Sequence, residues 1–298
     1  MLAPMPKVAF VTSKALESLY VDDLAARAAL EARGVTVIAA VWNDPAVRWA
    51  DFDLVVLRSP WDWYQNGTSF RTWLENLDRT GVRLENQGAA RFLDKAYLKA
   101  AEVRGARIIP TEWVSRGDPR SLAAIASARG FARAVVKPTL SANAHRTVLF
   151  DARDASDHEA QFRALVAEGD AMVQPFFPEV QDPGEWAFVF FEGTFSHALR
   201  KIAKQGDFRV QSDHGGTVQF EPTPPPKLIE QATTALRTVS DSPPLYARVD
   251  GVVRDGLLYL MELELVEPEL FFRAHPEAPA RFADAVLRRV ERSAMTSP

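Results

Sequence analysis

Short apolar runs alternate with amphipathic segments at the start of the chain. Residues 8–11, 35–41 and 52–57 are apolar runs of the length that buried strands have. Residues 22–33 are rich in Ala and Leu at helical spacing, and Gly34 follows, as glycine does after many helices. Strand, helix and strand in this order predict a parallel sheet covered by helices.

The carboxyl ends of these strands form the first candidate binding site. Ligands of open parallel sheets bind beyond those ends, where the connecting loops are exposed. Thr12 and Ser13 follow the first strand, and the segment 58–64 (RSPWDWY) follows the third. We therefore expect these residues to be exposed and available to a ligand.

The rest of the chain has a mixed pattern. Helices are expected at 92–104, 121–129, 158–168, 226–239 and 279–292, and strands at 107–109, 132–137, 146–150, 171–174, 186–191, 194–201 and 208–211. We divide the chain into an N-terminal α/β unit at 1–90, a central unit at 91–173 and a C-terminal unit at 174–298.

The segment 257–270, LLYLMELELVEPEL, places carboxylates inside an apolar strand. Glu262 and Glu264 are two positions apart, so their side chains share one face of the strand at about 6.7 Å. At an effective dielectric constant near 20 such a pair repels by about 2.5 kcal/mol. A cation is therefore expected beside these two carboxylates.

A hairpin brings a third carboxylate to the same face. If residues 254–256 form a three-residue turn, Asp250 lies opposite Leu260 and Arg248 lies opposite Glu262. A two-residue turn would instead put Asp250 on the other face. The odd turn predicts a Mg²⁺ or Mn²⁺ site made of Asp250, Glu262 and Glu264, since these metals prefer oxygen ligands. The alternative is a structural pair of Arg248 with Glu262, which leaves Glu264 in solvent.

Composition narrows the class of protein. A chain of 298 residues with 47% apolar residues can bury two or three cores. The absence of cysteine excludes thiolate chemistry, and a net charge of −4 argues against general nucleic-acid binding. No apolar run reaches the roughly 18 residues of a membrane span, and the start lacks the features of a signal peptide. These features predict a soluble, cytoplasmic protein without membrane or nucleic-acid partners.

Several separated motifs precede the acidic hairpin in a specific order. Lys95 lies in LDKAYLKA, Lys137 ends AVVKP, and residues 174–177 (QPFF) follow a strand. Glu185 lies in PGEWAF, and Arg209 lies with His214 and two glycines in GDFRVQSDHGG. Each motif alone is weak, because isolated lysines are mostly solvated and paired glycines are usually turns. Their order before a metal hairpin is much more specific.

This order resembles the ATP-grasp superfamily over residues 90–275. The resemblance implies an α/β (α+β) ATP-grasp fold, with a Rossmann-like N-terminal α/β domain followed by two α+β subdomains that grip ATP. It implies that Lys95 and Lys137 hold phosphates, that Glu185 binds ribose and that Arg209 contacts phosphate or the acyl intermediate. Lys137 and Arg209 are the implied catalytic residues. The implied adenine-binding residues are Gln174, Pro175, Phe176 and Phe177.

The metal residues of the related peptide ligases are an Asp, a Glu and an Asn, matched here by Asp250, Glu262 and Glu264. This chain departs from that pattern at Glu264. Three stretches, RSPWDWYQN, LENQGAARFLDK and ELELVEPELFF, are similar to the ATP-grasp cyclo-ligases that convert O-ureido-D-serine to D-cycloserine, and to their uncharacterised relatives. The resemblance implies a small amino acid derivative as substrate.

The segment after the third strand supplies candidate substrate residues. Arg58 is the expected partner of a substrate carboxylate and Asp62 of its ammonium group, with Trp61, Trp63 and Tyr64 as walls. The alternative for the tryptophans is packing at a domain interface. Arg273 is a second candidate anion-binding residue, and a solvated arginine is its alternative.

We expect an ATP- and Mg²⁺-dependent ligase that forms an acyl phosphate and releases ADP and phosphate, acting as a monomer or homodimer. Carboxylate activation needs cations to screen two anions and needs no nucleophilic side chain. The rivals are an intermolecular amide-forming ligase of the same fold, an ATP-binding regulatory protein without catalysis and a structural Ca²⁺-binding module.

Overall fold

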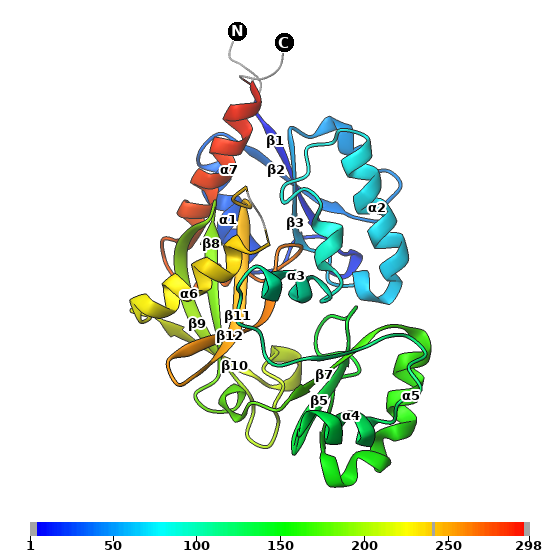
Figure 1. Ribbon diagram of the computed structural model, residues 1–298. Coiled ribbons are helices and arrows are strands. Elements are labelled where there is room, and N and C mark those ends of the chain that lie inside the picture. The colour runs from blue at the N-terminus through cyan, green and yellow to red at the C-terminus, as the bar shows by residue number, and fades with distance from the viewer. Residues whose placement is uncertain (1–4, 240–241, 295–298) are drawn as a thin grey trace.

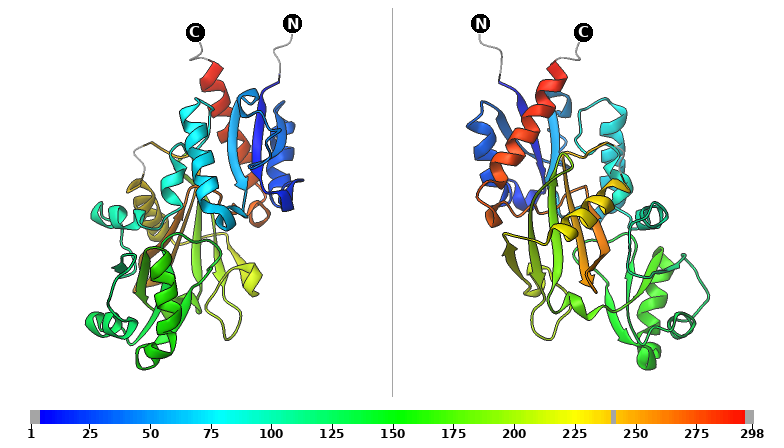
Figure 2. Two further views of the ribbon diagram at one scale, coloured as in Figure 1. Left: turned by 90° about the vertical axis from the view of Figure 1, so that its right-hand side faces the viewer. Right: turned by 60° about the vertical axis from the view of Figure 1, so that its left-hand side comes forward.

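The computed structural model describes residues 5–239 and 242–294, which form three sheets and the helices that cover them (Figure 1). The first sheet and the five-stranded sheet lie together in the body of the molecule, and the four-stranded sheet extends away from them (Figures 1 and 2). Short 3₁₀ helices connect these elements at Lys14–Leu16, Trp49–Asp51, Trp63–Asn66, Ala89–Phe92, Ala152–His158, Pro178–Val180, Ser212–His214 and Phe272–Ala274.

The N-terminal sheet is parallel, as predicted. Its strands β1 (Lys7–Thr12), β2 (Thr36–Val41) and β3 (Leu54–Ser59) have the order β2-β1-β3. Helix α1 (Asp23–Glu31) contacts the C-terminal helix α7 (Ala278–Ala294), so the two ends of the chain share one core. Helix α2 (Gly67–Arg79) was not predicted, although its buried residues Phe70, Leu74 and Leu77 have helical spacing.

The central sheet is antiparallel. It has the order β4-β7-β5-β6, with strands β4 (Glu112–Val114), β5 (Arg133–Pro138), β6 (Val148–Asp151) and β7 (Ala171–Pro175). Helices α4 (Leu122–Arg129) and α5 (Glu159–Glu168) share its core, whereas α3 (Tyr97–Val103) packs mainly with the C-terminal sheet. The predicted strand at 107–109 is wrong: only Ile108 forms a bridge, with Leu260, and Pro110 cannot donate to continue a ladder. The helix predicted from residue 92 begins five positions later, at Tyr97.

The C-terminal sheet is the largest. Its order is β10-β9-β8-β11-β12, with strands β8 (Glu185–Phe191), β9 (Thr194–Ile202), β10 (Thr217–Glu221), β11 (Tyr246–Arg254) and β12 (Leu257–Glu264), and helix α6 (Pro226–Arg237) packs on β11 and β12. The predicted strand at 208–211 is wrong. The Asp207 carboxylate accepts from the backbone N–H groups of Phe208 and Arg209, which favours a turn in place of a strand.

The hairpin of β11 and β12 corrects the predicted turn. Arg254 pairs with Leu257, so the turn contains only Asp255 and Gly256, both with positive φ angles of 54° and 72°. A bulge between Asp250 and Gly251 then shifts the register by one residue. Asp250 therefore pairs with Glu262 and still shares its face, because the bulge supplies the odd residue that was expected in the turn.

Replacing Gly251 by Ala tests this bulge. A Cβ atom there would lie 2.5 Å from the backbone oxygen of Tyr259, so the strands must separate. We expect Gly251→Ala to lower the free energy of unfolding by about 1–3 kcal/mol in urea titrations. Gly169→Ala is the control, because nothing lies within 4 Å of its Cβ position. Equal stability of the two variants would contradict the tight bulge.

Candidate active site

A cavity of about 470 Å³ lies where the three sheets meet. It is lined by residues of β5 and β7 on one side, by β12 and the segment after it on the other, and by the loop that follows β3. All eight residues predicted to bind ATP line it: Lys95, Lys137, Gln174, Pro175, Phe176, Phe177, Glu185 and Arg209. Segments more than 100 residues apart in sequence therefore form one site.

One end of the cavity is flat and mostly apolar. Phe176 and Phe177 line it with Val135, Ile109 and Met261. The guanidinium of Arg254 lies 3.6 Å from the ring centroid of Phe177, which holds that ring in place. The side-chain amide of Gln174 donates to the Thr111 hydroxyl over 2.9 Å. An aromatic base fits this end better than a charged group does.

The other end of the cavity is charged. Lys95, which is buried, donates to the backbone oxygen of Ser141 over 2.6 Å and forms an ion pair of 3.0 Å with Glu262. Lys137 also lines the cavity, and no described residue forms an ion pair with it. Burial and the charge of Lys95 lower the pKa of Lys137 to about 8. An anion such as a phosphate would restore the missing negative charge.

Lys201 lies in the cavity beside the predicted residues, and the sequence did not single it out. Its ammonium group is 2.5 Å from a Glu185 oxygen and 2.7 Å from an Asp250 oxygen, and it lines the cavity. Burial alone would lower the pKa of Lys201. The two carboxylates have the larger combined effect, so the pKa is raised. Lys201 pairs with Glu185 across β8 and β9, so only knowledge of the strand pairing could have revealed it.

Arg248 holds the acidic hairpin together. Its guanidinium donates to both oxygens of Asp250 and to Glu264, and its third contact is the backbone oxygen of Glu269 at 2.9 Å. Burial works to raise the pKa of Asp250, but Arg248 and Lys201 outweigh it and hold that pKa below the usual range. The alternative pair of Arg248 with Glu262 is wrong: Lys95 pairs with Glu262, and Arg248 with Asp250 and Glu264.

Two of the three predicted metal ligands fit a divalent cation. Glu262 and Glu264 line the cavity with 35% and 24% of their side chains exposed. Burial and the carboxylates of Asp250 and Glu262 raise the pKa of Glu264 to about 8, although Arg248 acts in the opposite direction. Asp250 does not fit, because both of its oxygens accept from Arg248 or Lys201 and it does not line the cavity. Among the described residues no group of three acidic or histidine side chains forms a metal site.

Two loops meet over the charged end. The side-chain amide of Asn143 donates to Asp213 over 2.7 Å, which joins the loop after β5 to the loop after β9. The His145 ring contacts Tyr64, whose side chain comes from the N-terminal unit. Arg209 lines the cavity and pairs with Asp207 over 2.7 Å. All three units of the chain therefore contribute to closing the site.

Trp61, Tyr64 and Arg273 are the predicted substrate residues that line the cavity. Trp63 lines it as well and donates to the Glu267 carboxylate. The sequence reasoning missed Tyr20, Glu267 and Glu269, which line this part of the cavity too. The alternating spacing of ELVEPELFF was the only signal for the two glutamates, because an extended segment points every second side chain the same way.

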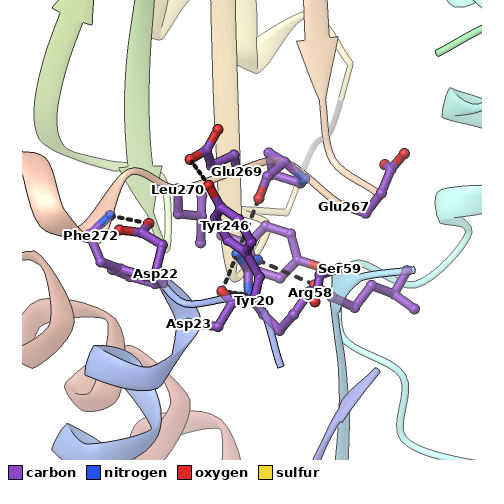
Figure 3. Close-up of polar contacts among 12 residues, drawn as sticks. Tyr20, Asp22, Asp23, Arg58, Ser59, Tyr246, Glu267, Glu269, Leu270 and Phe272 are labelled. Atoms are coloured by element: carbon purple, nitrogen blue, oxygen red, sulfur yellow. Dashed lines mark hydrogen bonds and ion pairs between the residues drawn. The ribbon is translucent and has the colours of Figure 1, made fainter. Parts of the chain in front are cut away.

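The structure corrects the roles of Arg58 and Asp62. Arg58 is 1% exposed and lies 2.9 Å from Asp23, so it cannot reach a ligand in the cavity (Figure 3). Asp62 accepts from the indole N–H of Trp42 over 2.8 Å and is not part of the lining. Thr12 and Ser13, expected to be exposed, are buried because the segment after β12 covers the end of the N-terminal sheet.

Residues 266–273, which follow β12, form an irregular segment, the 266–273 strip. Side chains hold its backbone at seven places. Its carbonyl oxygens at 266, 267, 268, 269 and 270 accept in turn from Tyr246, Trp61, Arg58, Arg248 and His197, and its N–H groups at 272 and 273 both donate to Asp22. Figure 3 shows the contact between Phe272 and Asp22. The strip is therefore fixed without belonging to a sheet.

Acid is expected to weaken this arrangement through His197. Its Nε2 donates to the backbone oxygen of Leu270 over 2.9 Å, and burial lowers its pKa to about 4, below the roughly 6.5 of an unfolded chain. Between these two pKa values the unfolded state binds the proton and the folded state does not. The free energy of unfolding therefore falls as the pH is lowered. From pH 7 to 5 the loss is about 2 kcal/mol in urea titrations. His197→Gln keeps an N–H donor and should lack this part of the pH dependence; an unchanged slope would contradict it.

Comparison with known proteins agrees with this geometry. Residues 8–86 match the family model of the N-terminal domain of D-cycloserine synthetase DcsG. The cycloserine biosynthesis protein DcsG of Streptomyces lavendulae is 32% identical over an alignment of 280 residues that covers 87% of this chain and 90% of that protein. The chain belongs to the DcsG family.

Solved structures confirm the fold of this DcsG relative. The crystal structure of D-cycloserine synthetase DcsG superposes with a TM-score of 0.84 at 29% identity, over 95% of this chain and 99% of that chain. The ATP-grasp ligase PsnB, complexed with minimal precursor, Mg and ADP, superposes with a TM-score of 0.64 at 15% identity, over 95% and 97%. The predicted ATP-grasp fold is confirmed.

Membership of the DcsG family also confirms the predicted class of enzyme. The protein is an ATP-dependent ligase that activates a carboxylate and forms ADP. Ligases of this fold use ATP and Mg²⁺, and those of the DcsG family act on small molecules. None of the helices in the described ranges is long and apolar enough to cross a membrane.

Proposed function

We propose that this enzyme transfers the γ-phosphoryl group of ATP to the carboxylate of a small amino acid derivative and then closes a ring, with O-ureido-D-serine as substrate and D-cycloserine as product. One observation carries the proposal. A single cavity is lined by the apolar residues Phe176 and Phe177, by Lys95, Lys137 and Lys201, and by the aromatic residues Trp61 and Tyr64, which suit a base, a triphosphate and a compact carboxylate substrate.

The chain's own residues have separate tasks in this reaction. Gln174, Pro175, Phe176 and Phe177 would hold adenine, and Glu185 the ribose hydroxyls. Lys95, Lys137 and Lys201 would neutralise the phosphates, while Arg209 stabilises the charge on the transferring group. Lys137 fits a catalytic role, because burial lowers its pKa and a phosphate oxygen would supply the charge that it lacks.

Glu262 and Glu264 would hold Mg²⁺ or Mn²⁺ together with phosphate oxygens, which supplies charge neutralisation between the two reacting anions. Asp250 would act indirectly, by fixing Lys201 and Arg248. Closure by the loops that Asn143 and Asp213 join would exclude water, which would otherwise hydrolyse an acyl phosphate.

Ring closure would use the nitrogen bonded to the side-chain oxygen of the same substrate molecule. This nitrogen attacks the acyl phosphate and expels phosphate, and water removes its carbamoyl group as carbon dioxide and ammonia. Every residue assigned here belongs to a single chain, which supports a monomer or a homodimer with independent sites. A cytoplasmic location is part of the same proposal, because ATP is the energy source. The net charge of −4 supports the absence of a nucleic-acid partner.

The proposal is tested by ADP release from the purified enzyme with a panel of amino acid derivatives, O-ureido-D-serine first. We expect turnover with that compound alone, and an acyl hydroxamate when hydroxylamine is added. Turnover that requires a second amine would favour an intermolecular ligase. Binding of ATP without ADP release from any carboxylate would favour a regulatory protein, and binding of Ca²⁺ without nucleotide a structural module.

A further inference from the structure

The 266–273 strip presents alternate side chains to the cavity. Glu267 and Glu269 line the cavity, while Pro268 and Leu270 are buried, and Arg273 lines the cavity from the short 3₁₀ helix that follows. Such alternation is typical of an extended chain with one face on a core and one on a ligand. The strip is therefore a surface built to face a small molecule, on a backbone that side chains hold at seven places.

Glu269 lies at the centre of this surface. One of its oxygens, Oε1, accepts from the Tyr20 hydroxyl over 3.2 Å and from Arg273 over 2.5 Å (Figure 3). The other oxygen has no partner among the described residues. The side chain is 21% exposed and lines the cavity, so a ligand can reach the second oxygen.

The charges around Glu269 do not balance. Arg273 is shared between Glu269 and Asp22, whose carboxylate lies 3.3 Å from the same guanidinium nitrogen. Two carboxylates thus face one guanidinium that is 49% exposed. The neighbouring Arg58 and Arg248 are already paired with Asp23, Asp250 and Glu264. Asp22 and Glu269 together therefore carry one negative charge more than Arg273 compensates, and a ligand cation could balance it.

Glu269 also lies close to the acidic hairpin. The Arg248 guanidinium donates to Glu264 through one nitrogen and to the backbone oxygen of Glu269 through another. Arg248 therefore links the backbone of residue 269 to the acidic hairpin, and the side chains of Glu264 and Glu269 line the same cavity.

We propose that Glu269 is a specificity-determining residue that receives the substrate's ammonium group on its free oxygen, with Tyr20 and Arg273 fixing its orientation. This inference rests on the proposed function and adds the group that selects amino acids over other carboxylates. Glu269 takes the role that the sequence predicted for Asp62, whose carboxylate lies outside the cavity. A carboxylate and an ammonium group form a charge-assisted hydrogen bond that a neutral analogue cannot make.

The test compares two compounds and two variants of the full-length enzyme. The compounds are O-ureido-D-serine and 3-(ureidooxy)propanoic acid, which lacks only the amino group. The variants are Glu269→Gln and Glu277→Gln. Glu277 pairs with Arg281 at the surface and is 67% exposed, so it controls for the loss of a glutamate from an arginine pair. Binding by calorimetry with ADP and Mg²⁺ and turnover by ADP release are both measured.

We expect Glu269→Gln to weaken binding and kcat/KM for O-ureido-D-serine by about 10- to 100-fold, the usual effect of losing a hydrogen bond to a charged group. The compound without the amino group should bind the wild type and Glu269→Gln equally well. Glu277→Gln should match the wild type with both compounds.

If Glu269→Gln loses binding and kcat/KM equally for both compounds, Glu269 only holds Arg273, and the inference is overturned. The inference is also overturned if this variant loses nothing with either compound. Wild-type turnover that does not depend on the amino group would overturn it while the proposed function stands. If the wild type neither binds nor turns over O-ureido-D-serine, the proposed function fails as well.

Discussion

Replacing Lys201 by Met is expected to lower the free energy of unfolding by about 3–5 kcal/mol and to reduce ATP turnover at least about 100-fold. Lys201 is the cation described beside Glu185, and it shares Asp250 with Arg248. Without it the buried Glu185 carboxylate has no compensating charge. The same change removes one of the lysines proposed to contact phosphate.

Urea titration and ADP release measure the two effects separately. The double variant Lys201→Met with Glu185→Gln should recover most of the stability, because the unpaired charge is gone, but none of the activity. Lys14→Met is the matched control, since that lysine pairs with Glu17 at the surface with 78% of its side chain exposed. An unfolding free energy of Lys201→Met within 1 kcal/mol of the wild type would contradict the buried network.

Lys137→Met is expected to have the opposite effect on stability and the same effect on activity. Burial and the neighbouring Lys95 lower the pKa of Lys137 to about 8, so the charged form destabilises the free enzyme at pH 7. Removing it should raise the free energy of unfolding by about 1–3 kcal/mol. ATP turnover should fall by about 100- to 1,000-fold, because a preorganised positive charge beside the transferring group is lost.

The pH dependence gives an independent check on Lys137. The unfolded lysine, with a pKa of about 10.4, holds its proton more tightly than the folded one. Stability of the wild type should therefore rise from pH 8 to 10, and Lys137→Met should lack this rise. A wild type whose stability is flat over this interval, or a Met variant that is less stable at pH 7, would show that Lys137 already has a partner in the free enzyme.

The order of motifs along the chain predicted residues that share one cavity. Lys95, Lys137, Glu185 and Arg209 come from different elements, yet all line it. The sequence could indicate this because each residue follows or begins a strand or helix whose apolar pattern is clear from local sequence. The N-terminal parallel sheet was predicted for the same reason.

Features that depend on contacts between residues far apart in the sequence could not be predicted from local apolar patterns. Arg58 is buried by the 266–273 strip, which lies more than 200 residues further along the chain, so its local sequence gave no sign of burial. Lys201 becomes functional only through its cross-strand position beside Glu185. The bulge at Asp250 and Gly251 leaves no pattern in one strand alone, yet it decides which face Asp250 occupies.

The proposed reaction depends on one chemical event, the phosphorylation of a carboxylate. Isotope transfer measures this event directly. O-ureido-D-serine labelled with ¹⁸O in its carboxylate is incubated with ATP, Mg²⁺ and the enzyme, and the phosphate formed is analysed by mass spectrometry. We predict one ¹⁸O atom in the inorganic phosphate for each ADP released, because a carboxylate oxygen attacks the γ-phosphorus and leaves with it. Unlabelled phosphate, or label in AMP with pyrophosphate as the other product, would contradict the account.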